Sequence, residues 1–522
     1  MQKRLLAVLI ILVLLLGLAA CGGGAQPSSS PVASVSSPSV SSPAQPSAEN
    51  KRVEITVAMP ATPNGFDPVS EDTWTSLSAQ FLVLEHLIDL DENLNMVPQL
   101  AKTWKQVDAV TWEFEIDLSA KFHNGDQLTM DDVVFSMERI KDVPKSADLG
   151  SNIDTVTYQG NILTLKIKQE NNGVLPRIMY TFGVINKKYV EEFGDEAIFT
   201  KPIGTGPYKL TEFTPGGDCV FDAWEDYHHG KRQVDRITFV SIPDATNRYI
   251  ALESGQVQFV SNLSFYEYDL ANKNAGIDAF VEPTNSTGLI YMQCEKPPFD
   301  NIKVRQAMYY ALNREGWGEL DGGRPLGQSV FYGGYPEFRP AKTRLPFDLA
   351  KAKELLAEAG YNESNPLKFT LLTHTYADPG LELYQSDLKS IGVECSIDVK
   401  EFSIYLTLEG PGDFDMGYCG IKNFGGAGIT DLERVDSRYI NTRNLPRYRN
   451  ARCDEIIDRA RVTTDPAELA SIIDELNEIV ERDVPWIPVL ARITRWAHSK
   501  DLQGAYTRAD WTVMFNDCVY TG

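Results

Sequence analysis

The 522-residue sequence is short of positive charge. Its 49 lysine and arginine residues stand against 72 aspartate and glutamate residues, and the formal net charge is −23 at pH 7. A chain with this excess of acid is repelled by phosphate backbones and by anionic lipid headgroups. The composition therefore argues against a nucleic-acid partner and against membrane attachment by charge alone. An apolar fraction of 43% and a charged fraction of 23% are ordinary for a soluble globular protein.

Cysteine is scarce as well, with 7 residues in the chain. Six of them follow Cys21, at Cys219, Cys294, Cys395, Cys419, Cys453 and Cys518. Six cysteines allow 15 full pairings, and the sequence does not choose among them. At this density the fold does not depend on disulfides as a small disulfide-rich scaffold would. The roughly 470 residues beyond position 50 are enough for two or three lobes.

Local motifs for catalysis and metal binding are lacking. The six histidines form no His-Glu-x-x-His pattern, and there is no Cys-x-x-Cys. His228 and His229 are adjacent, but neighbours in a strand or loop are expected to point apart, so a surface role is predicted for them. Gly204-Thr205-Gly206 lacks the lysine and the Ser/Thr of a phosphate loop, and no Gly-x-Ser-x-Gly elbow occurs. These absences favour a non-enzymatic protein without a metal or a cofactor.

Long hydrophobic runs are missing except at the N-terminus. Lys3 and Arg4 precede a run of 16 uncharged, mostly apolar residues, 5–20, which is short for a membrane span and suits a secretory signal. The run ends Leu-Ala-Ala-Cys-Gly, which resembles the bacterial lipobox. This resemblance implies a signal peptide at 1–20 that is removed, and Cys21 as a lipid-modified N-terminus. An ordinary signal peptide followed by a chance cysteine is the alternative.

Residues 22–50 form a segment that is not expected to fold. They hold ten serines and five prolines among 29 residues, with no aromatic residue. Such a chain cannot bury enough apolar surface to offset the entropy of ordering. As a flexible tether it reaches on the order of 30 Å. We therefore expect residues 21–50 to link a lipid anchor to a folded part that begins at about residue 51.

The folded part is predicted to be an α/β protein. Residues 349–359 and 381–391 show helical spacing of apolar residues, with Asp348 as an N-cap, and 393–399 alternates as a strand. Asp465 and Pro466 open the clearest helix, which stops before Pro485. The first half is richer in strands, at 52–59, 111–117, 155–168 and 234–242, and it contains one helix, 130–140, capped by Thr129 and Asp132.

Seven segments, in order, resemble the family 5 bacterial extracellular solute-binding proteins, the peptide- and nickel-type receptors of ABC importers. The longest is "LAKTWKQVDAVTWEFEIDLSAKFHNGDQLTMDDVVFSMERI" at 100–140. The others are "PIGTGPYKL" at 202–210, "DYHHGKRQVDRITF" at 226–239, "ALESGQVQF" at 251–259, "KPPFDNIKVRQAMYYALNRE" at 296–315, "LAKAKELLAEAGY" at 349–361 and 454–489. Most of these residues are expected to support the fold rather than to bind ligand, since large aromatic residues usually fill cores and glycines permit turns.

This resemblance implies a two-lobed periplasmic-binding-protein-like fold with a hinge, in which ligand is enclosed between the lobes. The first lobe would comprise 51–286 plus 490–522, with an extra subdomain at 85–200. The second lobe would be 287–489. Expected partners are a small-molecule or short-peptide ligand, ABC permease subunits, and the membrane through the lipid on Cys21. The chain is expected to act as a monomer at the extracytoplasmic face of the bacterial cell membrane.

The sequence departs from the peptide-binding relatives where the resemblance places the ligand. Those relatives generally carry a tryptophan, and two residues later an aspartate for the peptide's α-ammonium group, after a strand like "DFDMGYCG". Here Ile421 replaces the tryptophan, Asn423 replaces the aspartate, and Lys422 adds a positive charge. An alternative register within the glycine-rich stretch that follows would change these assignments. The full set of predicted ligand contacts is Asn64, Phe66, Tyr332, Tyr335, Phe402, Ile421, Lys422, Asn423 and Phe424.

A short peptide is the leading ligand class on this interpretation. The alternatives are a non-peptide ligand such as an opine, a glycoside or a metal chelate, a ligand sensor rather than an importer subunit, and a secreted enzyme on the same scaffold. Neighbouring permease and ATPase genes would argue against a sensor. Turnover of a captured ligand would identify an enzyme.

Overall fold

A computed structural model gives the fold of the second of the two units into which the chain divides, Arg52–Gly522; the first is Met1–Lys51. The structure describes residues 52–71, 73–92, 95–141, 150, 152–168, 179–180, 182–331, 339–342, 344–374, 380–422, 428–463 and 465–522. At 402, 403, 421, 422 and 428 it describes the backbone only. The predicted signal peptide, Cys21 and the predicted tether lie outside these residues. No helix among the described residues is long and apolar enough to cross a membrane.

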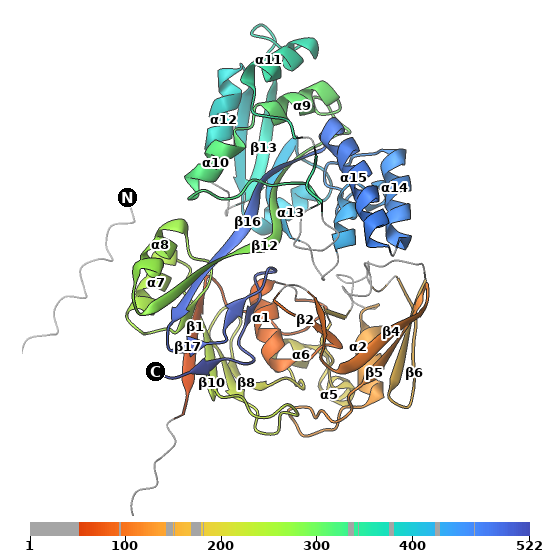
Figure 1. Ribbon diagram of the computed structural model, residues 1–522, viewed down its shortest axis with the longest axis vertical. Helices are drawn as coiled ribbons and strands as arrows, with labels where there is room; N and C mark the ends of the chain where they lie inside the picture. Colours follow the sequence, from red (N-terminus) through yellow and green to blue (C-terminus); the bar gives the residue numbers. More distant parts are fainter. Residues whose placement is uncertain are drawn as a thin grey trace, which may run out of the picture. The chain divides into compact units, whose positions relative to one another are not determined.

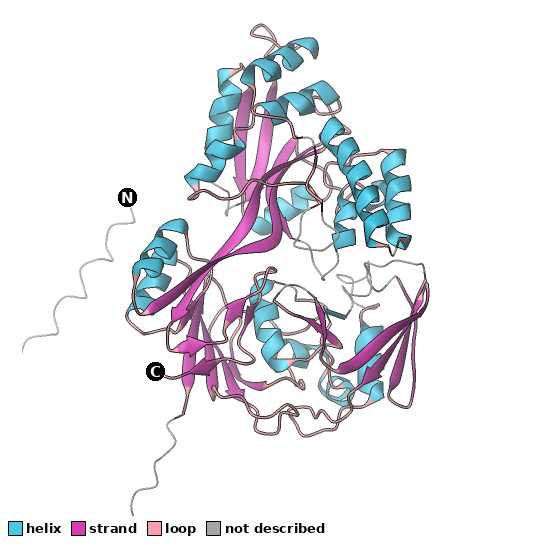
Figure 2. Cartoon of the chain, viewed as in Figure 1, coloured by secondary structure: helices cyan, strands magenta, loops and turns pink. Residues whose placement is uncertain are grey.

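One mixed sheet of ten strands forms the centre of this unit (Figures 1 and 2). In spatial order the strands are β14 (Glu394–Lys400), β13 (Lys368–His374), β15 (Met416–Lys422), β12 (Ile277–Met292), β16 (Trp486–Ser499), β11 (Phe259–Val260), β1 (Glu54–Met59), β10 (Arg236–Ser241), β9 (Cys219–Ala223) and β8 (Tyr208–Phe213). One half of the sheet is made of β1 and β8 to β11, and the other half is made of β12 to β16, so the chain completes the strands of one half before it enters the other.

Smaller sheets complete the strand set. A four-stranded antiparallel sheet has the order β4 (Ala101–Asp108), β5 (Thr111–Ile116), β7 (Ile162–Ile167) and β6 (Ile153–Gln159). Three two-stranded pairs join β2 (Ile88–Leu90) to β3 (Met96–Pro98), β17 (Leu502–Gln503) to β20 (Val519–Tyr520), and β18 (Tyr506–Thr507) to β19 (Val513–Met514).

Helices are placed between the strands throughout the unit. They are α1 (Trp74–Val83), α2 (Met130–Arg139), α5 (Lys187–Phe193), α6 (Asp195–Thr200), α7 (Ala245–Glu253), α8 (Phe265–Lys273), α9 (Ile302–Tyr310), α10 (Arg314–Leu320), α11 (Leu349–Glu358), α12 (Gly380–Ser390), α13 (Phe402–Glu409), α14 (Ala451–Val462) and α15 (Pro466–Asp483). Two 3₁₀ helices are η2 (Gly428–Arg434) and η3 (Ser437–Tyr439).

The helix starts that the sequence predicts from capping residues are confirmed. Asp348 caps α11 by accepting a hydrogen bond from the backbone N–H of Lys351, at 2.9 Å. Asp465 caps α15 in the same way, with Pro466 at the first helical position. Thr129 and Asp132 form a reciprocal capping box at the start of α2. In each case a short polar side chain satisfies a backbone donor that a helix start leaves unpaired, which is why the sequence alone locates these ends.

The glycines of "PIGTGPY" have a more specific role than permitting a turn. Gly204 and Gly206 both lie against the end of α1, where an added Cβ on Gly204 would overlap the carbonyl oxygen of Val83. The backbone N–H of Gly206 donates to that oxygen at 3.0 Å. The two glycines therefore let one backbone approach another closely. Their φ angles are not in the left-handed region, so conformational freedom is not the reason.

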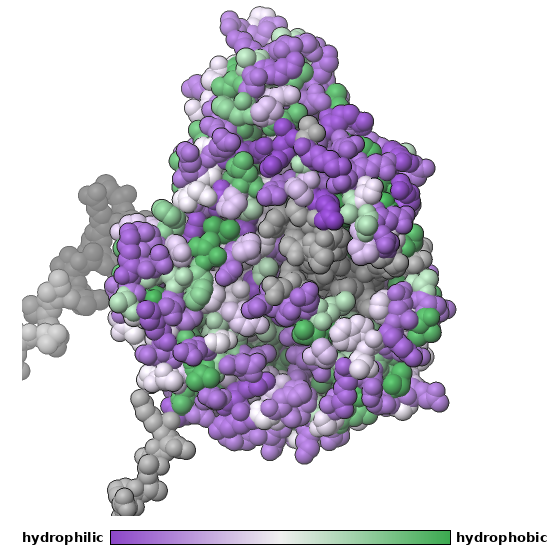
Figure 3. Space-filling view, viewed as in Figure 1, coloured by the Kyte–Doolittle hydropathy of each residue, from purple (hydrophilic) through white to green (hydrophobic). Residues whose placement is uncertain are grey.

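Buried apolar side chains form six clusters among the described residues, and no cluster mixes residues of 289–490 with the rest. Two clusters lie entirely within 289–490. The other four use residues of 53–280 and 496–520. The antiparallel strands β12 and β16 run from one set of clusters to the other (Figure 1). On the face drawn in Figure 3, hydrophilic residues predominate and apolar residues appear in small groups, as the composition predicts.

A buried acid in α15 gives the stability of the unit a pH dependence. Burial raises the pKa of the Glu481 carboxyl from 4.5 to about 7, while the charges of Arg314 and Arg344 oppose this shift. Because the folded pKa exceeds the unfolded one, protonation favours the folded state. The stabilisation is present in full below the unfolded pKa and is lost as pH rises from about 4.5 through 7.

We predict that Glu481→Gln, a neutral side chain of similar shape, removes this dependence. The free energy of unfolding of the variant should exceed that of the wild type by about 3 kcal/mol at pH 8 and should differ little from it at pH 4.5. Urea unfolding of both proteins at the two pH values measures this. An equal difference at both values would show that Glu481 does not titrate in this range.

Candidate functional site

Three strands, β15, β12 and β16, lie side by side where β15 ends. We call four residues at this place the junction site: Thr284, Thr287, Gly420 and Arg492. β12 lies between β15 and β16 in the sheet. Its pairing with β16 shifts register between Pro283 and Thr287, which marks a bulge or irregularity there. Bulges bend a strand and often stand next to functional sites. The junction site thus lies where β12 and β16 pass from one set of core clusters to the other.

Arg492 is the unusual side chain of the junction site. Its guanidinium reaches across β12 to Gly420 on β15, where an added Cβ would overlap it. No hydrogen bond or ion pair to a described residue engages this guanidinium, and its Nε is buried. Three residues along the same strand, Arg495 donates to the carboxylate of Asp321 at 3.2 Å and to the carbonyl oxygen of Asp321 at 2.9 Å. No described residue pairs with the positive charge of Arg492. The guanidinium is therefore available to bind an anionic group of a ligand.

Polar groups accompany Arg492 in the junction site. Thr284 donates its hydroxyl to the carbonyl oxygen of Arg492 at 2.9 Å, which fixes the strand backbone. The Thr287 hydroxyl is buried and has no hydrogen-bond partner among the described residues. A buried hydroxyl without a partner costs free energy that a bound polar ligand could recover. Partial burial, followed by the charge of Arg492, lowers the pKa of nearby His374.

Helix α13, whose first residue is the predicted contact Phe402, is fixed to the sheet by a buried polar cluster. Tyr405 of α13 and Tyr291 of β12 share a hydrogen bond of 2.6 Å between their hydroxyls. Tyr291 also donates to the Glu409 carboxylate at 2.7 Å. Burial raises the pKa of Glu409. The ring of Tyr291 packs so closely on Gly417 that an added Cβ would overlap it.

The structure describes the predicted ligand contacts unevenly. Ile421 and Lys422 end β15, where their backbones pair with Thr287 and Ser286 of β12, next to Gly420. Their side chains and that of Phe402 are not described. Tyr332, Tyr335, Asn423 and Phe424 lie outside the described residues. The contacts of Ile421 and Lys422 with a ligand stay a prediction, but their strand positions adjoin the junction site.

The two ligand contacts predicted in "ATPNGFDP" differ in their exposure to solvent. Asn64 is exposed, and its backbone N–H donates to the Ser76 hydroxyl at 3.3 Å. Phe66 has 0% exposed surface and packs edge-on against Phe213, with ring centroids 5.0 Å apart. Its ring offers no surface to a ligand in this arrangement and serves the core.

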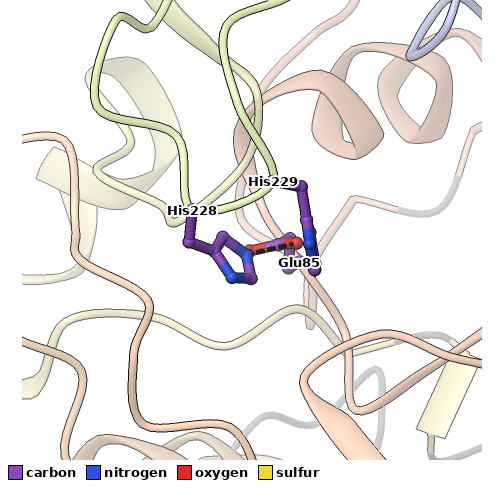
Figure 4. Close-up of side chains that lie close together, drawn as sticks. All are labelled: Glu85, His228 and His229. Carbon is purple, nitrogen blue, oxygen red and sulfur yellow. Dashed lines mark hydrogen bonds and ion pairs between the residues drawn. The ribbon is translucent and has the colours of Figure 1, made fainter.

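A second group of polar side chains lies away from β15, and we call Glu85, His228 and His229 the Glu-His-His cluster (Figure 4). Glu85 follows α1 and is fully buried. His228 Nε2 lies 3.0 and 2.9 Å from the two Glu85 carboxylate oxygens. Tyr227 donates its hydroxyl to the same carboxylate at 2.9 Å. Partial burial, followed by the neighbouring His228, lowers the pKa of His229.

The prediction that His228 and His229 point apart is wrong. Their ring centroids are 3.9 Å apart. The backbone N–H of Gly230 donates to the carbonyl oxygen of Tyr227 at 2.8 Å, so the two histidines are the central residues of a tight turn. Neighbouring side chains alternate in a strand, but a turn does not impose this alternation.

Comparison with known proteins assigns the chain to a family. A model described as bacterial extracellular solute-binding proteins, family 5 Middle, matches residues 95–427, more than half of the chain. The chain belongs to this family. It is therefore an extracellular solute-binding protein, and its role is to bind a ligand rather than to catalyse a reaction.

Individual relatives match this solute-binding protein over most of its length. It is 25% identical over 491 residues to the glutathione-binding protein GsiB of Escherichia coli K12, covering 89% of this chain and 94% of GsiB. The dipeptide binding protein of Pseudoalteromonas sp. SM9913, solved with Met-Leu, superposes with a TM-score of 0.81 at 20% identity. The oligopeptide-binding protein AppA of Bacillus subtilis, solved with a nonapeptide, gives 0.78 at 22%. Each structure covers 90% of this chain and 100% of its own. The mixed α/β fold is therefore the predicted two-lobed one.

Two functional candidates escaped the sequence analysis. Arg492 interrupts the apolar start of β16, "WIPVLAR", and an arginine inside such a strand was a usable signal. Glu85 likewise stands among apolar residues in "FLVLEHLI". Charged residues are rarely buried without a partner or a function.

Proposed function

We propose that the chain is the lipid-anchored substrate-binding component of an ABC importer, and that it captures a short peptide between two closing lobes and delivers it to a membrane permease. The observation that carries the proposal is the family match over residues 95–427. The relatives' names support a peptide-like ligand, since GsiB is a glutathione-binding protein and two of the similar structures hold peptides.

The proposed lobes are 51–286 plus 490–522, with the extra subdomain 85–200, and 287–489. The core clusters separate close to these limits, with Leu490 in a cluster of the second lobe, and this supports the division. The continuous pair β12–β16 would then be the connection that bends, and the register shift between Pro283 and Thr287 is a suitable place for the hinge. A hinge consists of a few residues whose backbone angles change during closure, while the packed parts on either side stay rigid.

Closure follows from binding in this proposal. A ligand that contacts both lobes binds the closed state more tightly than the open one, and this difference in affinity shifts the population toward closure. The permease would then distinguish the closed, loaded protein from the open, empty one.

Capture of a peptide should be visible as stabilisation of the folded protein. We expect at least one member of a panel of di- to pentapeptides to raise the melting temperature of the purified protein. A ligand at 100-fold over its Kd stabilises the native state by roughly 2.7 kcal/mol through mass action. Differential scanning fluorimetry across the panel measures this, and the best ligand is confirmed by calorimetry. A panel without any stabilising peptide would contradict the peptide assignment.

Attachment through Cys21 should be removable by one substitution. We predict that Cys21→Ser releases the protein from the membrane fraction into the soluble fraction, because stable attachment requires buried acyl chains and the acidic chain has no electrostatic substitute. The melting temperature of residues 52–522 should not change. Fractionation of cells that express either form measures the release. A serine form that remains with the membranes would contradict lipid anchoring.

A non-peptide or N-blocked ligand is the second candidate, and Arg492 is the observation that favours it. A guanidinium without a hydrogen-bond partner among the described residues, beside Gly420, attracts an anionic group and repels an ammonium group. Ligands with a neutral or anionic head at this position would fit, and opines or other carboxylates belong to this class.

A further inference from the structure

The Glu-His-His cluster has the donors of a transition-metal site. We propose that Glu85, His228 and His229 bind one divalent transition-metal ion such as Zn²⁺, at a site distinct from the ligand site of the proposed function. Two imidazoles and one carboxylate suit Zn²⁺ and its neighbours in the periodic table, whereas Ca²⁺ and Mg²⁺ prefer oxygen donors throughout.

The distances suit a common ion. One ligand atom from each of the three residues lies within 4.8 Å of the others. Ligand atoms about 2.0–2.2 Å from a tetrahedral ion lie roughly 3.4 Å from one another. His228 and Glu85, now 2.9 Å apart, would separate by about 0.5 Å to admit the ion. His229 would approach by rotation of its exposed side chain. Among the described residues this is the one group of three histidine, cysteine or acidic side chains with such spacing.

The surroundings hold the two inner ligands in place. Glu85 has no exposed surface, and its backbone carbonyl accepts a hydrogen bond from Val184 at 2.8 Å. The Tyr227 hydroxyl donates to the carboxylate, an outer contact of the kind that orients metal ligands. His229 is exposed and leaves a fourth position open to water or to another ligand. The nearby cation Arg232 is paired with Asp517 at 2.9 Å, which moderates its repulsion of an ion.

A metal here would join parts of the chain that are far apart in sequence. Glu85 and His228 are separated by 143 positions. The ion would connect Glu85, two residues after the end of α1, to the turn between β9 and β10. It would thereby stabilise the folded state in proportion to its occupancy.

The test uses the untagged mature protein, stripped with a chelator, desalted and titrated with ZnCl₂. We expect one Zn²⁺ per chain by calorimetry and a melting temperature that rises with Zn²⁺ but not with Mg²⁺. His229→Ala is the decisive variant because the residue is exposed and its loss does not disturb the core. It should bind Zn²⁺ at least ten-fold more weakly and lose the rise in melting temperature.

Glu363→Ala is the matched control, since it removes an acidic side chain that is 92% exposed and distant in sequence from the cluster. It should bind Zn²⁺ as the wild type does. Zn²⁺ binding of unchanged affinity and stoichiometry in His229→Ala would overturn the proposal, and so would the absence of binding to the wild type. Neither result bears on peptide capture, because the titration contains no peptide.

Discussion

An Arg492→Ala variant is expected to bind an N-succinylated dipeptide about 10- to 100-fold more weakly than the wild type does. A charge-assisted hydrogen bond contributes roughly 1.5–3 kcal/mol, and each factor of ten in affinity is about 1.4 kcal/mol. The wild type should prefer the succinyl form over the acetyl form, and the acetyl form over the free amine. Calorimetric titration of the three forms of one dipeptide measures the order. In Arg492→Ala the succinyl and acetyl forms should bind alike.

Three further variants separate the charge from its surroundings. Arg492→Lys keeps the positive charge but not the planar fork, so it should retain part of the preference. Gly420→Ala should reproduce the loss of succinyl preference although Arg492 itself is unchanged, because the added methyl group would displace the guanidinium. Arg449→Ala removes an arginine with a 61% exposed side chain elsewhere and should change nothing. If Arg492→Ala kept the succinyl preference, Arg492 would not be a ligand contact.

An Asn423→Asp variant is expected to gain affinity for the free-amino dipeptide by about 10- to 100-fold. An aspartate in a closed site is a strong partner for an α-ammonium group, whereas an amide carries no net charge. The gain should be absent for the N-acetylated dipeptide, which has no ammonium group. Titration of both peptides against both proteins measures the difference.

The outcome also separates the two ligand classes. Tight and equal binding of the free-amino dipeptide by wild type and Asn423→Asp would show that Asn423 does not replace an ammonium partner. The non-peptide alternative would then lose the support of that position, and Arg492 alone would remain in its favour.

The elements that the sequence predicts well are those whose causes are local. The starts of α11 and α15 follow from Asp348 and Asp465, each of which binds a backbone N–H three residues away. The strands β5 and β10 follow from alternating apolar residues within a few positions. The seven family-like segments then supply the two-lobed fold that the comparisons show.

The features that the sequence does not predict depend on long-range contacts or on turn geometry. Arg492 meets Gly420 because β12 lies between their strands, an order that no local pattern encodes. Glu85 meets His228 across 143 positions. The adjacent histidines converge because one backbone hydrogen bond, from Gly230 to Tyr227, turns the chain around them.

Small-angle X-ray scattering of the purified protein, with and without a saturating ligand found in the peptide panel, tests capture between closing lobes most directly. The account predicts that the radius of gyration falls on binding, because ligand bridges residues 51–286 and 287–489 and shifts the population to the closed state. A control peptide that does not raise the melting temperature should leave the scattering unchanged. A true ligand that raises the melting temperature but leaves the radius of gyration unchanged would contradict closure.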